Sequence, residues 1–135
     1  MGYRWYIESD RRMVTSILNI AAPPPTLRVI ACESPFTTDV LTTCWVEIDP
    51  REFPLLLKGY RFNEWPITGT LYGFKRFTSP IEPQTLPTIG DSRVGPDFPV
   101  AVEYMIQPKE FEHGGWVRIL ADATRRRAVV DLYIE

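Results

Sequence analysis

The chain has 135 residues and a formal charge of −2, with 44% hydrophobic and 24% charged residues. This usage excludes a wholly disordered chain and predicts one domain, residues 1–135. No apolar run approaches the ~18–20 residues of a membrane span, so no transmembrane segment is expected. Basic and acidic residues are mixed along the chain, which argues against a nucleic-acid partner. Thirteen prolines weigh against a helical bundle.

The N-terminal residues leave two structures open. The aromatic-rich segment Tyr3–Glu8 is typical of a first strand. Met13–Ile20 fits either a short helix or a second strand, and its β-branched content favours the strand. Pro23, Pro24 and Pro25 then predict a rigid, extended connection.

The middle of the chain contains three more expected strands. Thr26–Cys32 and Val40–Ile48 alternate between two faces, as strands do. Phe53–Lys58 is short and apolar, and predicts a single helical turn. Ile67–Phe77 predicts a strand with two internal glycines, and such glycines indicate a bulge or a sharp bend.

The segment Thr78–Pro99 has no periodicity and is rich in proline and glycine. A structureless stretch of this length is uncommon inside a compact domain and usually has a function. We therefore expect a long proline-rich loop at residues 78–99 that acts as an arm or lid.

The last third of the chain predicts an antiparallel meander of three strands. Apolar and polar residues alternate within Val100–Ile106, Val117–Ala121 and Ala128–Ile134, and turn residues separate these segments. One face of the meander should be core: Val102, Tyr104, Val117, Ile119, Val130 and Leu132. The whole pattern predicts a mainly β fold, an antiparallel sandwich or open barrel of about seven to nine strands. The alternative is an α+β domain with one or two short helices.

The residues that usually carry catalysis are few. His113 is the one histidine and sits in a turn, where side chains are solvated. Cys32 and Cys44 are expected to be buried free thiols, because a disulfide needs neighbouring strands with Cα atoms within about 7 Å. We therefore predict no catalytic residue, no metal site and no cofactor, and a soluble protein of the reducing cytoplasm.

Carboxylates form two closely spaced pairs. Glu47 and Asp49 share one strand face, and so would Glu8 and Asp10 if the first strand extends that far. Such pairs can hold a cation or act as acid and base. An exposed strand end is the simpler interpretation of both.

Three charged residues fall in the middle of the C-terminal strands. Glu103, Arg118 and Asp131 each lie on the polar side of the expected meander. Arg118 is able to pair with either carboxylate across the sheet, as opposite charges on adjacent strands often do.

Aromatic residues give the most suggestive functional signal. The segment Tyr60–Trp65 places Tyr60, Arg61, Phe62 and Trp65 around an expected turn. Trp, Tyr and Arg carry much of the binding energy of protein interfaces. These four residues are the predicted binding site, with the loop Thr78–Pro99 beside them.

These features favour a non-enzymatic interaction protein that binds a protein partner or a second copy of itself. Immunity or inhibitor proteins, and viral or phage accessory and structural proteins, are of this kind. The alternative is a small-ligand-binding β-barrel or an enzyme with an aromatic-lined pocket.

Overall fold

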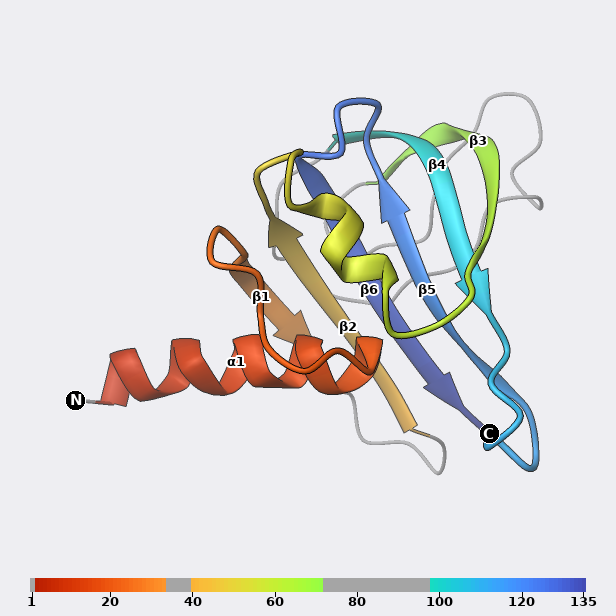
Figure 1. Ribbon diagram of the computed structural model, residues 1–135, viewed down its shortest axis with the longest axis horizontal. Coiled ribbons are helices and arrows are strands. Elements are labelled where there is room, and N and C mark those ends of the chain that lie inside the picture. Colours follow the sequence, from red (N-terminus) through yellow and green to blue (C-terminus); the bar gives the residue numbers. More distant parts are fainter. Residues whose placement is uncertain (1, 34–39, 72–97) are drawn as a thin grey trace.

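The computed structural model describes residues 2–33, 40–71 and 98–135. The described chain forms one α-helix, a short 3-10 helix and six strands (Figure 1). In chain order they are α1 (Gly2–Leu18), β1 (Arg28–Glu33), β2 (Val40–Glu47), η1 (Phe53–Leu57), β3 (Asn63–Leu71), β4 (Phe98–Ile106), β5 (Gly115–Ala121) and β6 (Arg127–Ile134).

The six strands form a single antiparallel sheet in the order β1-β2-β6-β5-β4-β3. The predicted C-terminal meander is confirmed, because β4, β5 and β6 are consecutive neighbours. The last strand lies in the interior of the sheet, between β2 and β5. The C-terminal third of the chain is therefore the centre of the fold.

The fold is mainly β, as the sequence predicts. The described residues form six strands in one sheet with two edges, β1 and β3. They do not show the seven to nine strands of the expected sandwich or open barrel. One α-helix and a short 3-10 helix accompany this sheet.

The strands favoured at Tyr3–Glu8 and Met13–Ile20 were wrong, because α1 runs from Gly2 to Leu18. For Met13–Ile20 the helical alternative is the correct one as far as Leu18. Buried Val14, Ile17 and Leu18 follow a helical spacing and face the sheet, so packing outweighs the weak helix propensity of β-branched residues. Asn19 ends the helix in the left-handed region, at φ 57°.

The helix end has the hydrogen bonds of a Schellman motif. The amide of Asn19 donates to the Ser16 carbonyl at 3.3 Å, and that of Ile20 donates to the Thr15 carbonyl at 3.1 Å. These bonds satisfy two of the carbonyl groups that every helix end leaves unpaired. They also turn the chain towards the proline connection.

One face of the sheet is covered by α1 and η1, which lie on the same side (Figure 1). Their apolar side chains pack on the inward side of β2, β4, β5 and β6. Five of the six predicted core residues are buried here, and the sixth, Leu132, is partly buried against them. The predicted helical turn at Phe53–Lys58 is confirmed as η1, whose Phe53 and Leu56 are buried.

The opposite face of the sheet has a second, smaller apolar cluster. Trp45 is completely buried there and meets Phe98 edge to face, with ring centroids 5.3 Å apart. Leu120 and Val129 complete the cluster with Val100. The central strands are therefore buried on both faces.

The edge strand β3 begins earlier than expected. Asn63, Glu64 and Trp65 belong to β3, so the turn predicted at Tyr60–Trp65 was wrong in its second half. The register of β3 against β4 shifts between Pro66 and Gly69, which confirms the irregularity that strand glycines indicate. Residues 72–77 of the expected strand lie outside the described residues.

Cys32 and Cys44 form a disulfide, so the expectation of free thiols was wrong. The two residues are directly opposed on β1 and β2, and their Cα atoms are 4.1 Å apart. The sequence alone does not reveal that Cys32 and Cys44 are opposed across β1 and β2. Because disulfides persist mainly in oxidising compartments, the bond favours such a compartment over the reducing one expected.

The disulfide ties an edge strand to the sheet beneath α1, where the Cys44 sulfur lies 3.9 Å from that of Met13. We expect reduction to lower the free energy of unfolding by about 2–3 kcal/mol, because the bond closes a short loop of the unfolded chain. Urea denaturation with and without reductant measures this difference. In the double variant Cys32→Ala/Cys44→Ala the reductant should have no effect. An equal midpoint for oxidised and reduced wild type would contradict the prediction.

Candidate functional site

The four predicted binding residues lie on different sides of the sheet. Tyr60 and Phe62 are partly buried against the core beneath α1 and η1, and their rings meet edge to face at 5.9 Å. Arg61, between them, is exposed. Trp65 is opposed to Glu103 on β4, so their side chains stand on the same face of the sheet. The next residue on β4, Tyr104, faces the core beneath α1, so Glu103 and Trp65 face the opposite side.

Beside Trp65, the structure gathers the three charged residues of the C-terminal strands. Glu103, Arg118 and Asp131 come from β4, β5 and β6, and their side chains are only 8%, 6% and 1% exposed. Arg118 donates from Nη2 to Asp131 Oδ2 at 2.7 Å. Its Nη1 lies 3.9 Å from Glu103 Oε2. The predicted cross-strand pairing is confirmed for both carboxylates; we call these three residues the ionic cluster.

The register of the strands explains this geometry. Arg118 and Asp131 are directly opposed on β5 and β6, so their side chains stand on one face at short range. Glu103 is opposed to Leu120, which places it diagonally from Arg118. The N–O distance is accordingly short between Arg118 and Asp131, at 2.7 Å, and longer between Arg118 and Glu103, at 3.9 Å.

Asp131 is the most fully bonded member of the ionic cluster. Its Oδ1 accepts a hydrogen bond from Thr43 Oγ1 at 2.9 Å, and its Oδ2 accepts one from Trp116 Nε1 at 3.0 Å in addition to that from Arg118. The Arg118 guanidinium also lies over the Trp116 ring, 4.8 Å from its centroid. Three strands, β2, β5 and β6, thus contribute to holding one buried ion pair.

Glu103 is less well compensated. Burial raises the pKa of its carboxyl group, and the negative charge of Asp131 acts in the same direction. Arg118 and a hydrogen bond from the Trp65 indole oppose this rise without cancelling it. Glu103 therefore takes up a proton more readily than an exposed glutamate does.

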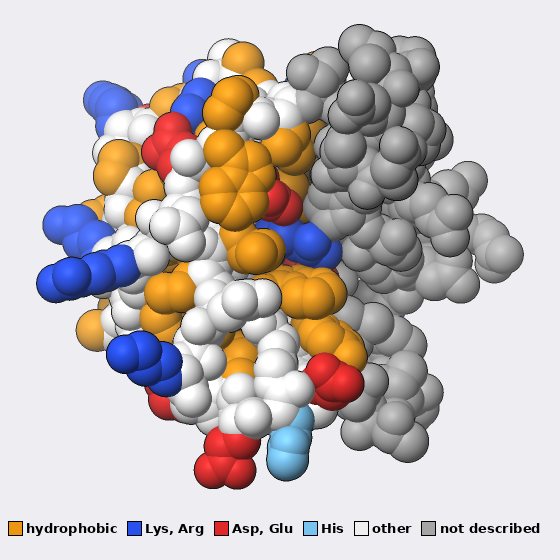
Figure 2. All heavy atoms as spheres, turned by 90° about the vertical axis from the view of Figure 1, so that its right-hand side faces the viewer, with side chains coloured by type: hydrophobic (Ala, Val, Ile, Leu, Met, Phe, Trp, Pro, Cys, Tyr) orange, Lys and Arg blue, Asp and Glu red, His pale blue; other side chains and the backbone are white. Residues whose placement is uncertain are grey.

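Trp65 connects the ionic cluster to the surface. Its side chain is 37% exposed on the edge strand β3, while its indole is bonded to buried Glu103. Figure 2 views the molecule from the side where β3 and β4 lie, and shows hydrophobic side chains gathered next to acidic and basic ones. A large ring is thus presented to solvent from a fixed anchor.

The paired carboxylates of the sequence have simpler partners. Glu47 forms an ion pair with Arg28, and Asp49 forms one with Arg51 at 2.8 Å. Hydrogen bonds from Arg51 lower the pKa of Asp49 to about 2. Glu8 lies in α1, so the expected strand pair with Asp10 does not form. Within the described ranges, no group of three or more metal-binding side chains comes together.

Three other expectations concern His113, the arm at residues 78–99 and a membrane span. His113 is exposed in its turn, as predicted. Of the expected arm Thr78–Pro99, only Phe98 and Pro99 are described, and they begin β4; the rest lies outside the described residues. No helix in the described part of the chain is long and apolar enough to cross a membrane.

Sequence reasoning identified the charged residues but not their burial, and it missed Thr43 and Trp116 as partners of Asp131. The sequence signal that this face of the sheet is covered was Leu120, an apolar residue between polar ones on the outward side of β5.

Comparisons with protein-family models, with curated proteins and with solved structures gave no match.

Proposed function

We propose that this chain is a non-enzymatic interaction domain that binds a protein partner, or a second copy of itself, at the β3 edge. Trp65 is the anchor of the contact, and exposed Arg61 contributes from the segment before β3, which Tyr60 and Phe62 hold against the core on the helix side. The observation that carries the proposal is the Trp65 ring, which is 37% exposed although its indole is bonded to a buried carboxylate.

A ring held in this way suits an interface. Tryptophan supplies a large contact area, and a fixed conformation reduces the entropy lost when a partner binds. The residues around it on β3, which are Asn63, Glu64 and Pro66, are also exposed. The partner therefore meets a continuous exposed stretch with one large apolar side chain.

The contact is expected to use side chains more than the backbone of β3. Edge strands offer unpaired backbone groups to an added strand, but Pro66 has no amide to donate. The shifted register between Pro66 and Gly69 interrupts the strand further. These features favour docking onto Trp65 over the addition of a strand to the sheet.

The proposal predicts that Trp65→Ala weakens binding by about 2 kcal/mol, or roughly thirtyfold, because truncating a central interface tryptophan typically costs at least this much. Sedimentation velocity would measure self-association, and capture from an extract of the source organism would measure partner binding. Arg61→Ala should weaken the same interaction to a smaller extent.

Ile30→Ala is the matched control, because Ile30 is 38% exposed on the opposite edge strand β1. It should leave both measurements unchanged. The proposal is wrong if wild type neither self-associates nor captures a partner, or if Trp65→Ala binds as wild type does. A large fall in Tm for Trp65→Ala would show that the ring serves stability instead.

A further inference from the structure

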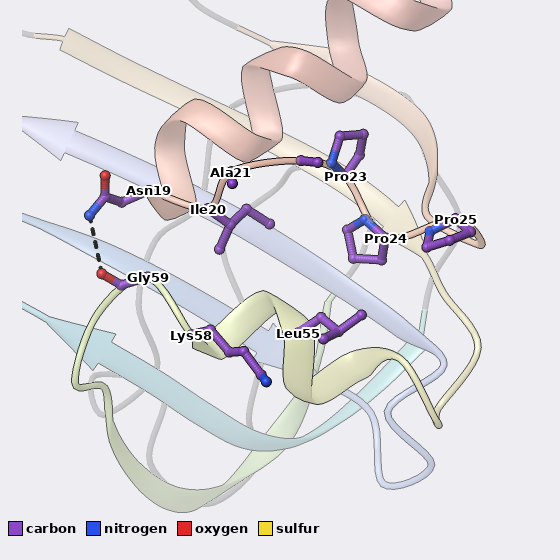
Figure 3. A pocket seen from close by; sticks show the side chains of 10 residues that line it. Asn19, Ile20, Ala21, Pro23, Pro24, Pro25, Leu55, Lys58 and Gly59 are labelled. Atoms are coloured by element: carbon purple, nitrogen blue, oxygen red, sulfur yellow. Dashed lines mark hydrogen bonds between the residues drawn. The ribbon is translucent and has the colours of Figure 1, made fainter.

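An open apolar groove lies between η1 and the connection from α1 to β1 (Figure 3). Its volume is about 400 Å³, which falls within the range of small-molecule sites. Ile20 and the proline rings of Pro23 and Pro24 form one side, and Leu55 of η1 forms the other. Leu55 is 37% exposed, so this wall is open to solvent.

The two sides of the groove are joined directly, without any ligand. Asn19 Nδ2 donates to the Gly59 carbonyl at 3.2 Å and joins the two sides. A Cβ atom at Gly59 would lie 1.9 Å from the Leu18 carbonyl oxygen, so only glycine permits this close approach of the two segments. The buried Pro24 is held by Arg11, whose Nη2 donates to its carbonyl at 3.1 Å.

The lining of the groove carries a single, positive charge. Lys58, at the C-terminal end of η1, is the only charged residue among those that line the groove. None of the ion pairs formed within the described residues involves Lys58. The proline walls have no backbone amides to donate, so the ammonium group is the main polar feature that a ligand meets.

We propose that this groove binds a small amphipathic monocarboxylate, whose hydrocarbon body lies between the proline wall and Leu55 and whose acid group pairs with Lys58. The preformed walls mean that little ordering entropy is lost on binding. The site is independent of the Trp65 contact, because it lies on the helix side of the sheet and Trp65 faces the other side.

Octanoate is a suitable probe, and octan-1-ol is its uncharged counterpart. Titration of the full chain, followed by amide chemical shifts in ¹H–¹⁵N NMR, should show saturable shifts confined to Ala21, Ala22, Leu55 and Gly59. We expect a Kd for octanoate on the order of 1 mM. Lys58→Gln should weaken octanoate binding about threefold to fivefold, the scale of an exposed ion pair, and leave octan-1-ol binding unchanged.

Lys109→Gln is the matched control, because Lys109 is an exposed lysine outside the groove. It should bind octanoate as wild type does. Leu55→Glu should abolish octanoate binding, since it removes one wall and adds a repelling charge. The proposal is overturned if octanoate shifts no groove amide, if Lys58→Gln binds it as tightly as wild type, or if both lysine variants weaken it equally.

Discussion

Truncation of the chain after Ala123 is expected to yield a protein that does not fold. The deletion removes β6, which pairs with β2 on one side and β5 on the other. Ala128, Val129 and Val130 are completely buried in it, on both faces of the sheet. The loss of these side chains and of two hydrogen-bonded ladders exceeds the roughly 5–15 kcal/mol by which a domain of this size is stable.

Near-ultraviolet circular dichroism and a thermal melt would show the expected loss of tertiary structure. Removal of Glu135 alone is the control, because this residue is exposed beyond the end of β6. It should melt as wild type does. A truncated chain that stays soluble and melts cooperatively would mean that the sheet closes without its interior strand.

The C-terminal meander could be predicted because its information is local. Each strand alternates apolar and polar residues, and turn residues join it to the next strand along the chain. Val117 and Ile119 show the pattern clearly, and both are completely buried. Pairing between neighbours in sequence needs no knowledge of distant segments.

The helix α1 was mistaken for strands because β-branched and aromatic residues suggest a strand when they are read singly. The correct signal was the spacing of Val14, Ile17 and Leu18, followed by Asn19 as a helix-ending residue. What decides the structure is the sheet face that this apolar side covers. That face is assembled from strands that lie much later in the chain.

The candidate site was predictable in its pairings but not in its setting. Arg118 is one strand away from both carboxylates, so cross-strand pairing follows from the alternation alone. Burial of these charges depends on both faces of the sheet being covered, which no single strand reveals. The hydrogen bond from Thr43 to Asp131 depends on the long-range pairing of β2 with β6. The disulfide between Cys44 and Cys32 likewise depends on the pairing of β2 with β1.

The ionic cluster provides the second large effect, and its two carboxylates should respond differently to the same change. We expect Asp131→Asn to lower the free energy of unfolding by about 3–5 kcal/mol, the cost of breaking a buried ion pair. The substitution keeps the shape but removes the charge that compensates Arg118 at 2.7 Å. It also replaces one of the two acceptor oxygens that receive the Thr43 and Trp116 hydrogen bonds with a donor.

Glu103→Gln is the matched control, and we expect it to change the free energy of unfolding by less than about 1 kcal/mol at neutral pH. Arg118 retains Asp131 in this variant, and glutamine can still accept the Trp65 hydrogen bond. The pKa of Glu103 is raised in the folded protein, so folding favours the protonated side chain. The contribution of this side chain to the free energy of unfolding is therefore fully present below its ordinary pKa of 4.5 and is lost as pH rises through the raised value. The stability of Glu103→Gln relative to wild type should therefore improve as pH rises through this window, as urea denaturation at a series of pH values would measure. Equal losses for the two variants, or a relative stability of Glu103→Gln that falls with rising pH, would show that Glu103 and Asp131 share the compensation of Arg118 equally.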